Sequence, residues 1–84
     1  MFTLYDYRNT LLDVTLSICS AYRMYCHPET REQCTIVMDK LREFNNKIHG
    51  ICVQADNGGN TEELQHIYEA TIDEFNNFKS QYGV

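Results

Sequence analysis

Apolar residues recur every three or four positions along this chain, and polar residues fill the positions between them. The first such run contains seven apolar residues: Leu4, Tyr7, Leu11, Val14, Ile18, Ala21 and Tyr25. This spacing gathers the apolar side chains on one side of an α-helix. Thr3 and Asp6 have the spacing of a capping box, and Phe2 lies one position before it. The pattern predicts a first helix over residues 3–26.

Two further runs repeat the same period. The second contains Cys34, Val37, Leu41, Phe44, Ile48, Ile51 and Ala55, and the third contains Leu64, Ile67, Tyr68, Ile72, Phe75, Phe78 and Tyr82. Pro28 suits a first helical turn, and Thr30 with Gln33 offers a second capping box nearby. The glycine pair at 58–59 marks a turn. The pattern predicts helices over residues 29–55 and 61–82.

Short connections between long helices favour antiparallel neighbours. We therefore expect an all-α fold in a single domain spanning residues 1–84. Its architecture is either an antiparallel three-helix bundle or a long helical hairpin with the third helix packed along it. A core built from 84 residues is small, and small domains commonly gain stability by self-association. We expect an oligomer on this ground.

The first helix carries a second apolar stripe. Tyr5, Leu12, Cys19 and Cys26 follow one another at seven-residue spacing, and Leu16, Tyr22 and Met24 lie beside them. A helix that is apolar over so wide an arc is either central in its own bundle or shared with another chain. Both alternatives are open from the sequence. The second one predicts a homodimer whose self-association residues are Tyr5, Leu12, Leu16 and Cys19.

The formal net charge of −5 lies entirely in the last third of the chain. Acids and bases balance through Ala55, whereas six acids and the single base Lys79 follow. Glu62, Glu69 and Asp73 lie along one side of the predicted third helix. A solvated face that maintains solubility explains them without a partner. The sharper hypothesis is that these three carboxylates bind a protein partner with a basic surface.

Composition argues against several functions. The acidic balance disfavours direct binding to nucleic acid or to anionic membranes, because both need clustered basic residues. No apolar run approaches the length of a membrane span, and no secretory signal is recognisable at the N-terminus. We therefore expect a cytoplasmic protein whose four cysteines are reduced and act as small buried apolar residues. Whether Cys26 and Cys34 pair under oxidising conditions is open.

No motif for catalysis, metal or cofactor binding rises above background. Cys26 and Cys34 flank the predicted hairpin turn, whereas His49 and Cys52 lie at its other end, so these metal-ligand types do not converge within one chain. The loop that starts at Asp56 lacks the glycine and glutamate of a calcium-binding loop at its sixth and twelfth positions. We expect no metal, no cofactor and no enzymatic activity.

The sequence favours a small acidic helical protein that binds and inhibits or adapts a protein partner through its third helix. The alternative function is that of a helical oligomer that binds a small ligand or a nucleotide at its subunit interfaces. In that case Arg8, Arg23 and Tyr22 on the first helix recognise the anion and the ring of the ligand.

Overall fold

The computed structural model describes residues 2–84, and these residues form helices joined by short connections. The helices are α1 (Leu4–Met24), α2 (Arg31–Asp56) and α3 (Thr61–Tyr82), with a short 3-10 helix, η1 (Pro28–Thr30), between α1 and α2. No strand occurs among these residues. The predicted all-α fold class is confirmed, and each helix begins and ends within two residues of the predicted range.

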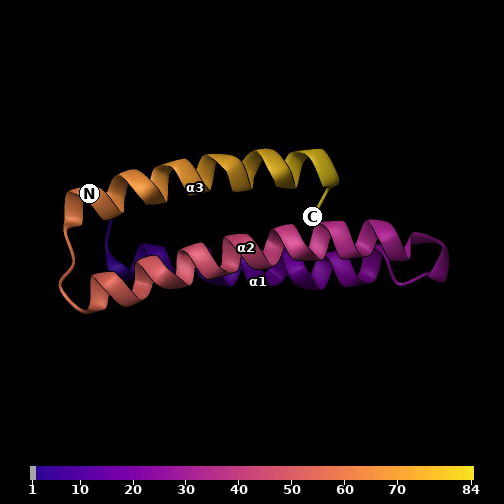
Figure 1. Ribbon diagram of the computed structural model, residues 1–84, viewed down its shortest axis with the longest axis horizontal. Helices are drawn as coiled ribbons and strands as arrows, with labels where there is room; N and C mark the ends of the chain where they lie inside the picture. Colours follow the sequence, from indigo (N-terminus) through magenta and orange to yellow (C-terminus); the bar gives the residue numbers. More distant parts are fainter. Residues whose placement is uncertain (1) are drawn as a thin grey trace.

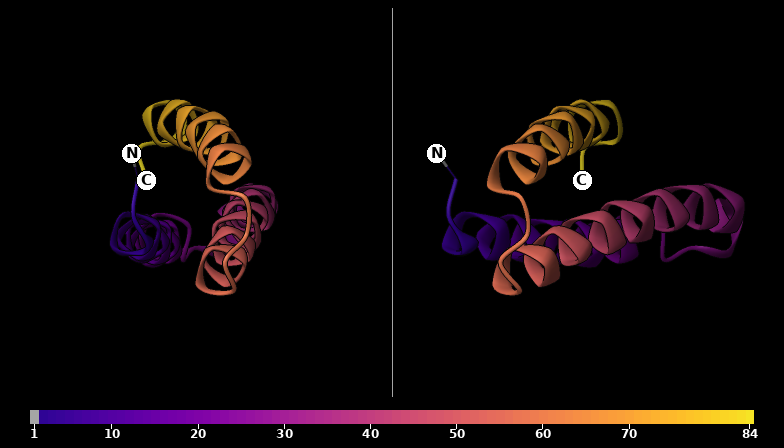
Figure 2. Two further views of the ribbon diagram at one scale, coloured as in Figure 1. Left: turned by 90° about the vertical axis from the view of Figure 1, so that its left-hand side faces the viewer. Right: turned by 60° about the vertical axis from the view of Figure 1, so that its left-hand side comes forward.

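The chain runs along the long axis of the molecule three times. α1 and α2 form an antiparallel hairpin, and α3 returns along it in the direction of α1 (Figure 1). Seen from one end, the three helices lie at the corners of a triangle (Figure 2). The molecule measures 45 × 20 × 16 Å. The hairpin turn extends past the C-terminal end of α3 (Figure 1), so α3 leaves that part of the hairpin uncovered.

Side-chain caps begin two of the three helices. At α1, the Thr3 amide donates to Asp6 Oδ2 (2.8 Å) and the Asp6 amide donates to Thr3 Oγ1 (3.3 Å), which completes the predicted capping box. At α3, the Glu63 amide donates to Asn60 Oδ1 (3.1 Å). The predicted capping box at Thr30 does not form. The Thr30 hydroxyl instead donates to the His27 carbonyl (3.0 Å) within η1.

The core consists of two clusters of buried side chains arranged along the long axis. The larger cluster lies in the half toward the hairpin turn and contains Val14, Ala21, Val37, Met38, Leu41, Phe44, Phe75 and Phe78. The smaller one lies beside the α2–α3 loop and contains Tyr7, Ile48, Ile51, Cys52, Leu64 and Tyr68. Phe44 packs against the rings of Phe75 and Phe78 at centroid distances of 5.5 and 5.6 Å. All three helices contribute to both clusters.

Most residues predicted to be buried are buried in the structure. The exceptions depend on which side of each helix faces its neighbours. Ile67 was expected inside but is 44% exposed, because the buried side of α3 is centred on Leu64, Tyr68 and Phe75. Thr71 is buried in its place, and its hydroxyl is satisfied by the Ile67 carbonyl at 2.7 Å. Threonine carries an apolar methyl group, so it fills a core position once its hydroxyl is bonded.

The expectation that all four cysteines are buried is wrong. Cys52 alone is buried, Cys34 is half-buried, and Cys19 and Cys26 are exposed. All four are free thiols. Cys19 lies on the side of α1 that no other helix covers, and Cys26 follows the end of α1 in the uncovered turn. The second apolar stripe of the first helix, which contains Cys19 and Cys26, was the sequence signal for this exposure, but a cysteine suits both buried and exposed environments.

The two ends of the described chain lie in the space between α1 and α3 (Figure 2). Phe2 packs edge-on against the Tyr68 ring, with 4.7 Å between centroids. At the other end, the Ser17 hydroxyl donates to the Val84 carbonyl at 3.1 Å. The chain ends thus fill the α1–α3 boundary where the helices themselves approach least. Among residues 2–84, no helix has the length and apolarity that crossing a bilayer requires.

Candidate interaction surfaces

The acidic face of α3 consists of Glu62, Glu69 and Asp73, all of which are exposed. Each lies two positions before a buried residue of the same helix, namely Leu64, Thr71 and Phe75. Two positions correspond to about 200° around an α-helix, so the three carboxylates point away from the core. Glu62 also lies in the first turn, where the helix dipole favours a negative charge. The packing of α3 therefore presents this acidic face to solvent.

No base within residues 2–84 forms an ion pair with the acidic face of α3. The ion pairs among residues 2–84 are Lys40–Glu43, Asp39–Arg42 and Lys47–Glu74, and none includes Glu62, Glu69 or Asp73. The single base of α3, Lys79, lies over the Phe75 ring with its Nζ 4.6 Å from the centroid. Glu69 and Asp73 lie four positions apart on one side of the helix, which places two like charges next to each other.

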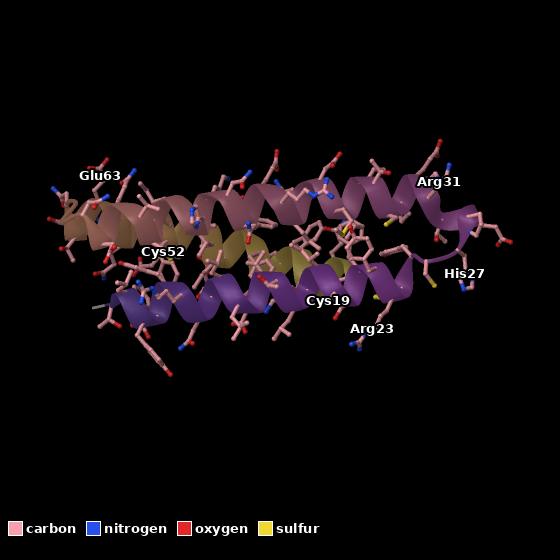
Figure 3. The ribbon with its side chains drawn as sticks, turned by 90° about the horizontal axis from the view of Figure 1, so that it is seen from below. Cys19, Arg23, His27, Arg31, Cys52 and Glu63 are labelled. Carbon is pink, nitrogen blue, oxygen red and sulfur yellow. The ribbon has the colours of Figure 1, made fainter. Side chains whose placement is uncertain are left out.

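The outer face of α1 consists of Tyr5, Leu12, Leu16 and Cys19. The first three are 72%, 57% and 57% exposed, and Cys19 is exposed as well. The sequence left open whether this stripe is buried centrally in the bundle or available to another chain. The exposed fractions show that it is not buried in the bundle. Cys19 lies on α1 and Cys52 lies toward the other end of the bundle (Figure 3). Self-association through this face stays a prediction. An uncovered apolar row of this kind is a candidate contact surface.

A hollow of about 430 Å³ lies at the hairpin end, where α3 does not cover the helices. Its lining includes Tyr22, Cys26, His27, Arg31, Cys34 and Arg42. His27 and Arg31 lie close to the turn, far from Cys52 (Figure 3). Cys26 and Cys34 therefore share one hollow and Cys52 belongs to another part of the molecule. No group of three metal-ligand side chains gathers anywhere in the described part of the chain.

Arg8, Tyr22 and Arg23, the proposed ligand-binding residues of the alternative function, do not come together within one chain. Arg8 and Arg23 lie 15 positions apart on α1, which corresponds to about 22 Å along a helix. Tyr22 lines the hairpin-end hollow instead, together with Arg31 and Arg42. The sequence pattern did not indicate these two arginines, because only the antiparallel return of α2 places them in the same hollow as Tyr22.

The titratable groups with altered acidity lie in the smaller core cluster. Burial raises the pKa of the Tyr7 hydroxyl, with a smaller contribution from neighbouring Tyr68. Burial also raises the pKa of Tyr68, although a hydrogen bond with Thr10 partly opposes this. The pKa of the Cys52 thiol is raised by burial and partly lowered by Arg8. All three groups are thus held in their neutral forms, as a packed core requires.

Comparison of the chain with protein family models, with curated proteins and with solved structures finds no match.

Proposed function

We propose that this protein is a non-enzymatic helical interaction protein that binds a partner with a basic surface through the acidic face of α3. Binding inhibits or adapts the partner. The observation that supports this proposal is the exposed pair Glu69 and Asp73, like charges four positions apart with no base bonded to either. Such a pair destabilises a helix by a few tenths of a kcal/mol. A basic partner surface relieves that repulsion.

The dimensions of the acidic face suit a protein partner. Glu62 and Asp73 are 11 positions apart, which corresponds to about 16 Å along α3. This length matches three turns of a basic helix or one basic loop. Asn76 and Asn77 continue the same exposed side and offer amide groups that both donate and accept hydrogen bonds. Long-range attraction between the opposite charges accelerates the encounter and makes it sensitive to salt.

The buried titratable groups Tyr7, Tyr68 and Cys52 offer no catalytic acid, base or nucleophile. Tyr7 and Tyr68 pack edge-on against each other, with 4.7 Å between their ring centroids, and Cys52 belongs to the same buried cluster. A catalytic acid, base or nucleophile needs access to substrate, and groups enclosed in this way lack it. Their neutral forms stabilise the core.

The test is affinity capture from a lysate of the source cells with three forms of the tagged protein. The first is the wild type, and the second carries Glu62→Gln, Glu69→Gln and Asp73→Asn. The third form is a control for net charge. It loses the same number of negative charges outside α3, by the substitutions Glu29→Gln, Glu32→Gln and Glu43→Gln. All three forms should show the same circular dichroism spectrum, because every altered residue is exposed.

We expect one partner to be retained by the wild type and by the control form but lost from the α3 form. Moderate salt should release it, because the contact is ionic. A partner that the α3 form retains equally well would exclude the acidic face as the binding surface.

The hairpin-end hollow favours a second candidate function, the binding of a small anionic aromatic ligand. Tyr22 offers a ring for stacking, and Arg31 and Arg42 offer positive charge. Arg42 also contacts Asp39 at 4.0 Å, which reduces the charge available to a ligand. The test is the melting temperature of the protein in the presence of each member of a panel of nucleotides. A ligand that binds only the folded state raises the melting temperature. An unchanged melting temperature across the panel would exclude it for those ligands.

A further inference from the structure

The outer face of α1 has the heptad pattern of a coiled coil. Tyr5, Leu12 and Cys19 follow one another at seven-residue spacing and occupy the position called d. The matching a positions are Asn9, Leu16 and Arg23. All six side chains are exposed. The pattern therefore runs for three heptads on a surface that no other part of the described chain covers.

This seam is independent of the core. Tyr5, Leu12 and Cys19 each lie two positions before a buried residue of α1, namely Tyr7, Val14 and Ala21. The d positions are thus about 200° around the helix from the side that packs against α2 and α3. Arg23, which belongs to the same seam, lies on the side of α1 remote from α2 (Figure 3). A second helix can pack along the seam without displacing any core residue.

We propose that the outer face of α1 pairs with α1 of a second copy of this chain in a parallel, in-register coiled coil. Leu12, Leu16 and Cys19 each pack against their own counterparts, and the two bundles lie on opposite sides of the seam. This pairing goes beyond the proposed binding of a basic partner. The acidic face of α3 stays free in each copy, so the dimer presents that face twice and binds with greater avidity to a repeated target.

Charge complementarity argues for a second copy as the occupant. Arg8 occupies position g, and Asp13 occupies position e of the following heptad. In a parallel pair these positions lie side by side, so the Arg8 guanidinium of each copy meets the Asp13 carboxylate of the other. Both residues are exposed and neither forms an ion pair within residues 2–84. The surface is therefore complementary to itself.

The orientation follows from two residues. An antiparallel pair that joins Leu12 to Leu16 of the other copy brings Asp13 against its own counterpart, which is repulsive. The parallel pair places Asn9 against Asn9 at an a position, where a single buried asparagine fixes register and dimeric state. Arg23 meets its counterpart in the last turn of α1, and its long side chain lets the guanidinium reach solvent. A seam of three heptads with these polar layers predicts a weak dimer.

Oxidative crosslinking at position 19 tests the orientation. The first form retains Cys19 as its only exposed thiol, through Cys26→Ser and Cys34→Ser, with Cys52 left in the core. A matched form additionally carries Cys19→Ser and Thr15→Cys, which moves the thiol to a g position. Each form is treated with diamide, which accepts the two electrons and two protons when two thiols join, and dimers are counted on a non-reducing gel.

We expect the Cys19 form to crosslink efficiently and the Thr15→Cys form to crosslink poorly. Crosslinking mainly through position 15 would show an antiparallel pair and overturn the proposed orientation. Equal crosslinking at both positions would indicate random collision and overturn the pairing itself.

Sedimentation equilibrium tests the same pairing without chemistry. Leu16→Glu should raise the dimer dissociation constant by at least about 100-fold, because it places charge inside the seam. Ile36→Glu is the matched control: Ile36 and Leu16 are both 57% exposed, but Ile36 lies on α2, outside the seam. Arg8→Glu should weaken the dimer and Arg8→Glu with Asp13→Arg should restore it. A wild type that stays monomeric at the highest attainable concentration would overturn the proposal.

Discussion

The hydroxyl groups of Thr10 and Tyr68 share a buried hydrogen bond of 2.6 Å that joins α1 to α3. The Tyr68 hydroxyl also donates to the Asp6 carbonyl at 3.4 Å. The Tyr68 ring is enclosed by Phe2 and Tyr7, each with its centroid 4.7 Å away. α1 and α3 contact each other less than either contacts α2. The Thr10–Tyr68 hydrogen bond and the aromatic rings around it therefore provide much of the contact between α1 and α3.

Replacing Tyr68 with phenylalanine should lower the free energy of unfolding by about 1–2 kcal/mol. The substitution keeps the ring but leaves the buried Thr10 hydroxyl without its partner, and an unsatisfied buried polar group is costly. Urea denaturation monitored by circular dichroism measures the change. Tyr22→Phe is the control because Tyr22 is 56% exposed, and it should change stability by less than about 0.5 kcal/mol. Equal stability of the Tyr68 variant and wild type would contradict the importance of this contact.

Leu41→Ala should destabilise the fold by about 2–5 kcal/mol. Leu41 is fully buried in the larger core cluster, so its truncation removes apolar contacts and leaves a cavity. Ile36→Ala, on an exposed site of the same helix, should cost less than about 0.5 kcal/mol. Thermal denaturation at a fixed protein concentration compares the two variants. Similar losses at both sites would show that the core does not lie where the packing places it.

Stability should fall as the pH rises above about 8. Burial raises the pKa of Tyr7, Tyr68 and Cys52 in the folded state, so the unfolded chain ionises first and takes a growing share of the equilibrium. The stabilisation is complete below the unfolded pKa values and is lost through the folded ones. Urea denaturation at several pH values measures the slope.

Single tyrosine variants identify the source of that slope. Tyr7→Phe should make it shallower, whereas Tyr22→Phe should leave it unchanged because Tyr22 is 56% exposed and lies outside both core clusters. A slope that Tyr22→Phe reduces as much as Tyr7→Phe would show that burial is not its cause.

Thiol labelling should separate the cysteines by position. Cys26 is exposed in the uncovered turn and should react with a maleimide within minutes, whereas Cys52 should react only when the core opens. Mass spectrometry of the digested protein measures labelling at each site over time. Destabilising the core with Leu41→Ala should accelerate the reaction of Cys52 and leave that of Cys26 unchanged. Rapid labelling of Cys52 in the wild type would contradict its burial.

The period of the apolar residues was sufficient to predict the helices and most of their buried sides. It did not predict the burial of Thr10 and Ser17, because their hydroxyls are satisfied by partners distant in the sequence, Tyr68 and Val84. Spacing along one helix also cannot distinguish the inner apolar stripe of α1 from the outer one. That distinction depends on how α2 and α3 share the surface of α1, which only the folded chain determines.

The acidic face of α3, in contrast, could be predicted from the sequence. Glu62, Glu69 and Asp73 were identified from the sequence because charge and helical period already place them together on one side. The hairpin-end hollow was not identified from the sequence, because Tyr22 and Arg42 line it together only through the antiparallel return of α2. Local periodicity therefore finds a surface built on one helix and misses a site built between two.

The most direct test of partner binding by the acidic face is the affinity for the captured partner across a salt series, measured for the wild type and for the Glu62→Gln, Glu69→Gln and Asp73→Asn form. Wild-type affinity should fall steeply with salt, and the altered form should bind weakly with little salt dependence. Equal affinities at every salt concentration would contradict the claim that the acidic face of α3 binds the partner.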